Sequence, residues 1–139
     1  MSKRISVSDI IKMKRKQKIV CLTAYTYPVA KIIDKYVDVI LVGDSVGMVL
    51  YGMENTLPVT INMMEFQGKA VVKASEKSMV VVDMPFGSYQ KSKEDAYANS
   101  ARIMAATGCS AIKLEGGSEM AATVKYLVER GIPVMGHIG

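Results

Sequence analysis

The sequence contains no tryptophan, a single histidine and only two cysteines, and each scarcity excludes a class of protein. Cys21 and Cys109 lie far apart, in or beside apolar segments, which favours small buried side chains in a reducing compartment over a disulfide framework. Structural zinc sites use closely spaced cysteines and histidines, and no such pair occurs. A disulfide-stabilised secreted domain and a zinc-finger protein are therefore excluded.

Long hydrophobic runs are also lacking. No uninterrupted stretch reaches the roughly 18 apolar residues that a membrane span requires. The polar and basic N-terminus has no apolar segment of the kind found in secretory signal peptides. We therefore expect a cytoplasmic protein that does not contact a membrane.

Acidic residues are fewer than basic ones, and the net charge is +5 at pH 7. Much of the excess falls in one short segment, which contains Lys12, Lys14, Arg15, Lys16 and Lys18. No aromatic side chains interleave with these cations, so the segment favours a solvated helix end over a nucleic-acid surface. We expect no nucleic-acid partner.

Hydrophobic residues make up half of the chain, which is enough for the core of one domain. Short apolar runs alternate with segments that carry helix signals, and the runs occupy residues 19–23, 37–42, 79–83, 111–115 and 133–136. The helices are expected to begin after Ser6 and to cover residues 28–36, 61–75, 92–108 and 118–130, with residues 43–60 as one long loop. This order predicts a parallel α/β sheet covered by helices.

Two α/β architectures fit this order: a small doubly wound sheet, and the first five strands of a (β/α)8 TIM barrel. The chain stops at Gly139, directly after an apolar run and without a helix to cover that run. A doubly wound domain normally ends in a packing helix, whereas a barrel of about 250 residues continues. We therefore expect residues 1–139 to be the N-terminal portion of a single barrel domain, which is an incomplete barrel.

Three of the apolar runs end on or just before a carboxylate, namely Asp44, Asp83 and Glu115. The carboxyl ends of parallel strands meet at one edge of a sheet, so these acids are expected to gather there. Carboxylate oxygens without thiolate or imidazole partners select Mg2+ or a similarly hard cation. The alternative is that each acid only caps a helix or ends a strand.

Lys113 and His137 are expected to face the same site as the three carboxylates. Strand side chains alternate, so Lys113 and Glu115 point to one side of the sheet. Lys113 then either binds the carboxylate of a 2-oxo acid or forms a structural salt bridge with Glu115 or Asp83. His137 follows the last apolar run and is a further candidate for proton donation or substrate contact, with a structural role as the alternative.

Ser45 suggests a different mechanism, because Gly43-Asp44-Ser45-Val46-Gly47 matches the nucleophile elbow of serine hydrolases. Asp83 or Glu115 followed by His137 preserves the order of the hydrolase triad. The elbow requires a helix directly behind the serine, and the sequence after Ser45 offers no convincing helix. A nucleophilic role for Ser45 is therefore disfavoured.

Several longer motifs together resemble the ketopantoate hydroxymethyltransferase family across essentially the whole chain. They are Leu22-Thr23-Ala24-Tyr25, Leu41-Val42-Gly43-Asp44-Ser45-Val46-Gly47-Met48, Asn55-Thr56-Leu57-Pro58-Val59-Thr60, Asp83-Met84-Pro85-Phe86, Ile112-Lys113-Leu114-Glu115-Gly116-Gly117 and Pro133-Val134-Met135-Gly136-His137-Ile138-Gly139. The resemblance implies a (β/α)8 barrel that transfers a hydroxymethyl group from 5,10-methylenetetrahydrofolate to 3-methyl-2-oxobutanoate. The product is 2-dehydropantoate, in pantothenate and coenzyme A biosynthesis.

The resemblance also implies site residues and partners. Mg2+ would be bound by Asp44, Asp83 and Glu115 and would stabilise the enolate of the oxo acid. The oxo acid would contact Asp44, Ser45, Asp83 and Lys113. The folate would be the co-substrate, and the full-length enzyme would form a homo-oligomer.

Two differences from the family's sequence pattern limit which residue roles the resemblance implies for this chain. The family usually has aspartate where this chain has Thr26, although threonine can also cap a helix. The family's proton acceptor is a glutamate on a later strand, expected beyond residue 139, and no residue here matches it. The chain could therefore be a catalytically inactive fragment or remnant that keeps only the metal and oxo-acid site, or a subunit that needs a complementary half.

We expect the purified 139-residue chain to show no turnover of 3-methyl-2-oxobutanoate with methylenetetrahydrofolate, because the general base is absent. A coupled assay for 2-dehydropantoate would measure this. Turnover above the uncatalysed rate would contradict the assignment of the base to a later strand.

Overall fold

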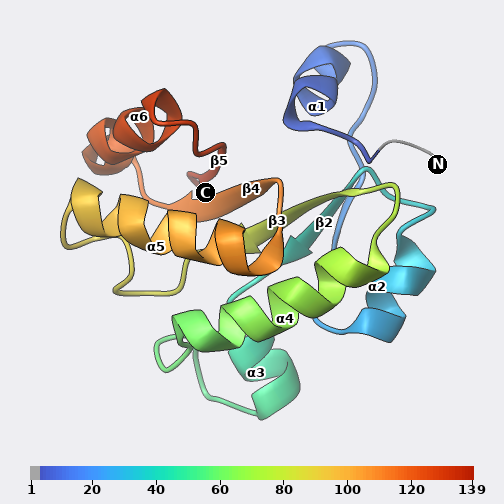
Figure 1. Ribbon diagram of the computed structural model, residues 1–139, viewed down its shortest axis with the longest axis horizontal. Helices are drawn as coiled ribbons and strands as arrows, with labels where there is room; N and C mark the ends of the chain where they lie inside the picture. Colours follow the sequence, from blue (N-terminus) through green and yellow to red (C-terminus); the bar gives the residue numbers. More distant parts are fainter. Residues whose placement is uncertain (1–3) are drawn as a thin grey trace.

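Five parallel strands form the sheet at the centre of the computed structural model, which describes residues 4–139. The strands are β1 (Cys21–Thr23), β2 (Val39–Val42), β3 (Met79–Asp83), β4 (Ala111–Glu115) and β5 (Val134–His137). They lie side by side in chain order, β1-β2-β3-β4-β5 (Figure 1). In a doubly wound sheet the first strand lies in the interior, with later strands on both sides of it. The observed order places β1 at the edge, which excludes a doubly wound sheet and matches consecutive strands of a barrel.

One helix precedes the first strand, and the other helices follow strands and connect them on one side of the sheet. They are α1 (Val7–Met13), α2 (Tyr27–Ile33), α3 (Val46–Tyr51), α4 (Ile61–Ala74), α5 (Lys93–Thr107) and α6 (Ala121–Glu129), with a 3-10 turn, η1, at Ser118–Met120. Helices α4 and α5 pack against each other beside the sheet (Figure 1). None of the helices in the described part combines the length and the apolar character that crossing a bilayer needs.

Local capping signals in the sequence are confirmed. Ser6 caps α1 and forms a reciprocal capping box with Asp9, and Ser92 accepts a hydrogen bond from the Asp95 amide at the start of α5. Gly108 ends α5 with φ 73°, a left-handed conformation that favours glycine. These helix ends depend on neighbouring residues alone, which is why the sequence predicted them.

The expectation of one loop over residues 43–60 is wrong, because α3 lies within it. Helix α3 is short and apolar, and its buried residues are Val46 and Gly47. A Cβ at residue 47 would lie 2.6 Å from a methyl carbon of Val59, so glycine permits this close packing. Short isolated helices are marginal in water, and here tertiary packing stabilises one that local signals did not indicate.

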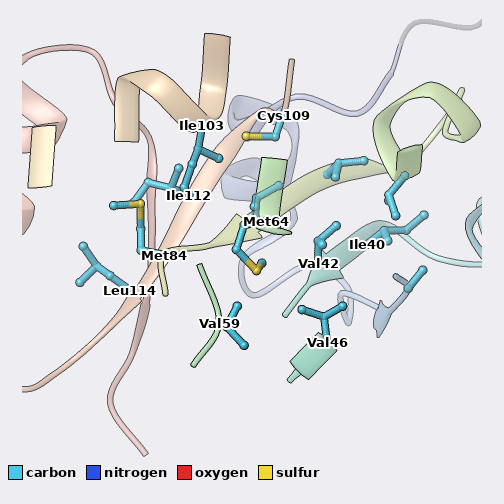
Figure 2. Packing of buried hydrophobic residues seen from close by; sticks show 14 of the residues in the cluster. Ile40, Val42, Val46, Val59, Met64, Met84, Ile103, Cys109, Ile112 and Leu114 are labelled. Atoms are coloured by element: carbon cyan, nitrogen blue, oxygen red, sulfur yellow. The ribbon is translucent and has the colours of Figure 1, made fainter. Parts of the chain in front are cut away.

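The pairing register divides the sheet into two faces. On the outer face, residues such as Ile40 and Ile112 pack with Met64 of α4 and Ile103 of α5 in the main hydrophobic core (Figure 2). These four side chains are fully buried. The outer face therefore holds most of the apolar surface that stabilises the fold.

The inner face changes character along the strands. At its amino end, Val39, Met79 and Ala111, the first residues of β2, β3 and β4, belong to a second apolar cluster with Val81. Partly buried side chains from α1 and the preceding segment, including Ile10, pack against this cluster. The carboxyl end of the same face is left for polar side chains.

The two cysteines differ in exposure. Cys109 is buried, as expected, but Cys21 is exposed, so the expectation for it is wrong. Strand β1 lies at the edge of the sheet and pairs only with β2, so its side chains lack a neighbouring strand on the other side. Both thiols are free.

Asp34, the C-cap residue of α2, is hydrogen-bonded to the segment that precedes β3. Its carboxylate accepts hydrogen bonds from the backbone amides of Glu76, Lys77 and Ser78 at 2.9, 3.0 and 2.9 Å. Burial by itself raises the pKa of the Asp34 carboxyl, but the hydrogen bonds from Ser78, Glu76 and Lys77 outweigh it and hold the pKa below its ordinary value.

Replacement of this carboxylate, Asp34→Asn, should lower the free energy of unfolding by about 2 kcal/mol at neutral pH, because the nitrogen of the new carboxamide is a donor and cannot accept from a backbone amide, which leaves at least one amide unpaired. The native carboxyl has a depressed pKa, so its contribution is present above its ordinary pKa of 3.8 and is lost as the pH falls through the folded value. Urea unfolding at several pH values measures the difference. The exposed control Glu54→Gln should change little, and an Asp34→Asn deficit that persisted in acid would contradict this account.

Candidate functional site

Charged side chains gather at the carboxyl end of the inner face. Asp83 is the last residue of β3 and lies opposite Lys113 in the register with β4. Glu115 is the last residue of β4 and lies opposite His137, the last residue of β5. The alternation argument, which put Lys113 and Glu115 on one side, is confirmed by their contact.

Lys113 links the two acids. Its Nζ lies 2.9 Å from Asp83 Oδ1 and 3.8 Å from Glu115 Oε1. The side chains of Lys113 and Asp83 are only 13% and 8% exposed, whereas that of Glu115 is 60% exposed. His137 completes the row, with Nδ1 3.0 Å from Glu115 Oε1. The site therefore contains a buried ion pair that continues into an exposed one.

Asp44 approaches this row from the loop after β2. Its backbone N–H donates to Asp83 Oδ2 at 3.0 Å, so both oxygens of Asp83 have partners. Gly43 permits the approach, because a Cβ there would lie 2.7 Å from Ser45 Oγ and 3.4 Å from Asp83 Oδ2. The side chain of Thr56, which sequence reasoning did not select, lies near the Asp44 carboxyl and lowers its pKa slightly against the larger effects that raise it.

Ser45 stands at the N-cap of α3, so a helix does follow it, contrary to expectation. Its Oγ is hydrogen-bonded to the hydroxyl of Tyr25 at 2.7 Å. Among residues 4–139 no hydrogen bond joins Ser45 to His137, whose ring contacts Glu115 instead. These contacts do not form the triad of a serine hydrolase.

Tyr25 and Tyr89 are site residues that the sequence did not reveal. Tyr25 occurs in a motif of the family resemblance, but only the fold brings its hydroxyl to Ser45. Tyr89 lies in the loop between β3 and α5, is 5% exposed, and accepts a hydrogen bond from the Glu115 amide at 3.3 Å. No local pattern distinguishes a loop tyrosine of this kind from an exposed one.

The carboxyls affect each other's protonation. Burial raises the pKa of Asp44, and the negative charges of Asp83 and Glu115 raise it further. Burial also raises the pKa of Asp83, although the hydrogen bond and charge of Lys113 oppose this. Crowded carboxylates with raised pKa values gain free energy when a cation joins them.

The fit to a metal ion is partial as the side chains lie. No group of three or more histidine, cysteine, aspartate or glutamate side chains in the described residues is arranged to hold a metal ion. Lys113 stands between Asp83 and Glu115, and Glu115 turns to His137. The donor chemistry nevertheless suits a hard cation, since Asp44, Asp83 and Glu115 offer carboxylate oxygens within electrostatic reach of one another.

A family model described as ketopantoate hydroxymethyltransferase matches residues 4–139. A protein named 3-methyl-2-oxobutanoate hydroxymethyltransferase from Paramagnetospirillum magneticum is 59% identical over 137 residues, which are 99% of this chain and 50% of that protein. One of the same name from Bartonella tribocorum is 60% identical over 139 residues, covering 100% of this chain and 51% of that protein. The chain spans about half the length of the curated relatives it matches.

Solved structures support the barrel assignment. A 2,3-dimethylmalate lyase, described as a PEP mutase/isocitrate lyase superfamily member, has a TM-score of 0.69 at 11% identity, covering 97% of this chain and 51% of that chain. An oxaloacetate acetylhydrolase has a TM-score of 0.65 at 10% identity, with 91% and 49% covered. At these identities the likeness shows the fold alone, and it confirms the (β/α)8 prediction.

Replacing the buried cation, Lys113→Met, should lower the free energy of unfolding by about 3 kcal/mol at neutral pH, because Asp83 is left as an unpaired buried charge. Without Lys113 the already raised pKa of Asp83 rises further, so the deficit should shrink as acid neutralises Asp83. Urea unfolding at neutral and mildly acidic pH measures both effects. Lys125→Met, which removes an exposed lysine paired with Glu129, is the control and should change stability little. A deficit that grew in acid would contradict the assignment.

Proposed function

Because this chain belongs to the ketopantoate hydroxymethyltransferase family, we propose that it supplies the oxo-acid and metal site of an enzyme of pantothenate biosynthesis. The proposed reaction transfers a hydroxymethyl group from 5,10-methylenetetrahydrofolate to 3-methyl-2-oxobutanoate and yields 2-dehydropantoate. The whole enzyme is proposed to be a cytoplasmic homo-oligomer.

The observation that carries the proposal is the Asp83–Lys113 pair with Asp44 and Ser45 beside it. These residues come from β3, β4 and the loop after β2, and they meet at the carboxyl end of the sheet. This end is where barrel enzymes hold their substrates. Opposite charges in a largely buried place also suit a small polar ligand that can replace one partner of an ion pair.

Lys113 is the proposed anchor for the carboxylate of the oxo acid. Its ammonium group has three N–H donors, of which one donates to Asp83 Oδ1 at 2.9 Å, while Glu115 Oε1 lies 3.8 Å away, so a donor remains for a carboxylate ligand. Ser45 is the proposed second contact. The Tyr25 hydroxyl holds Ser45 Oγ at 2.7 Å, which restricts its rotation and orients it before the ligand arrives.

Mg2+ is proposed to be bound by Asp44, Asp83 and Glu115. When bound, it would supply positive charge that polarises the carbonyl group of the oxo acid. Support comes from the raised pKa of Asp44 and Asp83, which shows that burial and mutual repulsion disfavour their charged forms. For Glu115 to join, its carboxylate must leave His137, which is exposed enough to turn away.

The family resemblance assigns the proton acceptor to a glutamate on a later strand. The carboxylates described above are therefore assigned to binding only. In this arrangement Lys113 and Ser45 hold the oxo acid, while Asp83 orients the Lys113 ammonium group through the 2.9 Å contact. His137 orients Glu115.

Titration calorimetry tests the site directly, with MgCl2 and 3-methyl-2-oxobutanoate as ligands. Asp83→Asn should weaken Mg2+ binding by at least about tenfold, because one anionic ligand is lost and Lys113 loses its partner. Asp95→Asn is the matched control, since Asp95 is a half-exposed aspartate on α5 that pairs with Lys91.

Equal Mg2+ affinity in the wild type and Asp83→Asn would overturn the metal assignment. Oxo-acid binding that survives Lys113→Met unchanged would overturn the assignment of the carboxylate anchor. Circular dichroism of each variant checks that the fold is retained.

A further inference from the structure

The hydroxyl group of Tyr89 takes the place of a strand beside the end of β4. Successive backbone amides of a strand point to opposite sides, and the Gly116 amide donates to the His137 carbonyl oxygen of β5 at 3.2 Å. The preceding amide, that of Glu115, therefore points toward β3. Strand β3 ends at Asp83 and does not reach this amide. The Tyr89 hydroxyl oxygen accepts it instead, at 3.3 Å.

The same hydroxyl keeps a proton that it can donate. Burial raises the pKa of Tyr89, whose side chain is 5% exposed, and the hydrogen bond from the Glu115 amide opposes this only in part. The negative charges of Glu115, Asp44 and Asp83 raise the pKa further, and Glu115 has the largest effect of the three. A phenol donates one hydrogen bond as well as accepting. Among residues 4–139 no group accepts this proton.

Packing alone does not require the hydroxyl group. The ring of Tyr89 belongs to the main hydrophobic core, and a phenylalanine ring would fill the same space. The hydroxyl lies at the polar end of this core, beside the carboxylates of the site. Its lone pair serves the Glu115 amide, so its proton is the part that has no structural use.

The Glu115 carboxylate lies between polar groups on the two sides of β4. On the β5 side, His137 Nδ1 is 3.0 Å from Glu115 Oε1. On the β3 side is the Tyr89 hydroxyl. The other two acids of the site are also on the β3 side, because Asp83 ends β3 and Asp44 follows β2. A carboxylate that turns from His137 toward these acids therefore turns toward the Tyr89 hydroxyl.

We propose that Tyr89 is a positioning residue for Glu115, and that its hydroxyl group donates to the Glu115 carboxylate and holds it toward Asp44 and Asp83 when a divalent cation binds. The inference rests on the proposed function for the cation site. The side chain of Glu115 is 60% exposed and has room to turn. The hydroxyl is fixed by the backbone amide of the same residue, so the donor stays in place relative to the carboxylate it orients.

A double-mutant cycle tests this, with titration calorimetry of MgCl2 into the 139-residue chain. Tyr89→Phe removes the hydroxyl but keeps the ring, and it should weaken Mg2+ binding by about tenfold, because a hydrogen bond to a charged group is lost. Glu115→Ala should weaken binding at least as much. In the Glu115→Ala background, Tyr89→Phe should have no further effect, since the carboxylate on which the hydroxyl acts is absent.

Tyr36→Phe is the matched control, because Tyr36 is 69% exposed and precedes β2, at the opposite end of the sheet. It should leave the Mg2+ affinity unchanged. An unchanged affinity in Tyr89→Phe, or an equal loss in both backgrounds, would overturn the inference, because an equal loss is what a purely structural role produces. The proposed function survives either result if Asp83→Asn still weakens binding. Mg2+ affinity that ignores both Asp83→Asn and Glu115→Ala would overturn the metal site and the inference together.

A second measurement needs no variant and so does not depend on how well Tyr89→Phe folds. Saturation of the wild-type chain with MgCl2 should shift the NMR resonances of the Tyr89 ring, which gains an acceptor, and of the His137 ring, which loses Glu115. The ring resonances of Tyr36 should stay in place. A Tyr89 ring that does not respond to saturating Mg2+ would contradict the inference.

Discussion

The buried contact between Asp83 and Lys113 is the interaction on which the rest of the site depends. A carboxylate that is 8% exposed requires a partner, and the register of β3 with β4 places the lysine directly opposite it. The same carboxylate accepts the Asp44 amide, which fixes the loop that carries Ser45. One ion pair therefore sets the positions of residues from three separate segments.

The inner face of the sheet is apolar at the amino ends of its strands and polar at their carboxyl ends. The polar site therefore does not interrupt the hydrophobic packing that stabilises the fold. Apolar residues at the amino end, such as Val39 and Met79, pack beneath α1, while the outer face carries the main core. Stability is thus supplied away from the carboxyl end. The charged groups at the carboxyl end can therefore lie close together and face a ligand, although like charges repel one another there and Asp83 has a raised pKa.

Much of the site could be predicted, because alternation and strand ends are local rules. The runs at Met79–Asp83 and Ala111–Glu115 coincide with β3 and β4, and alternation placed Lys113 and Glu115 on one side. The hydroxyls of Tyr25 and Tyr89 and helix α3 could not be predicted, since each depends on contacts across the fold. The exposure of Cys21 was missed for the same reason, because an edge strand has no signature within its own three residues.

The sequence by itself determined the parallel α/β class, the helix ends at Ser6, Ser92 and Gly108, and the set of acids that end the strands. These follow from backbone propensities and side-chain periodicity, which act over a few neighbouring residues. Only the tertiary structure decided that Asp83 pairs with Lys113 while Glu115 contacts His137. The physical reason is that register and burial arise from packing between segments distant in sequence, and no local pattern encodes which buried charge meets which.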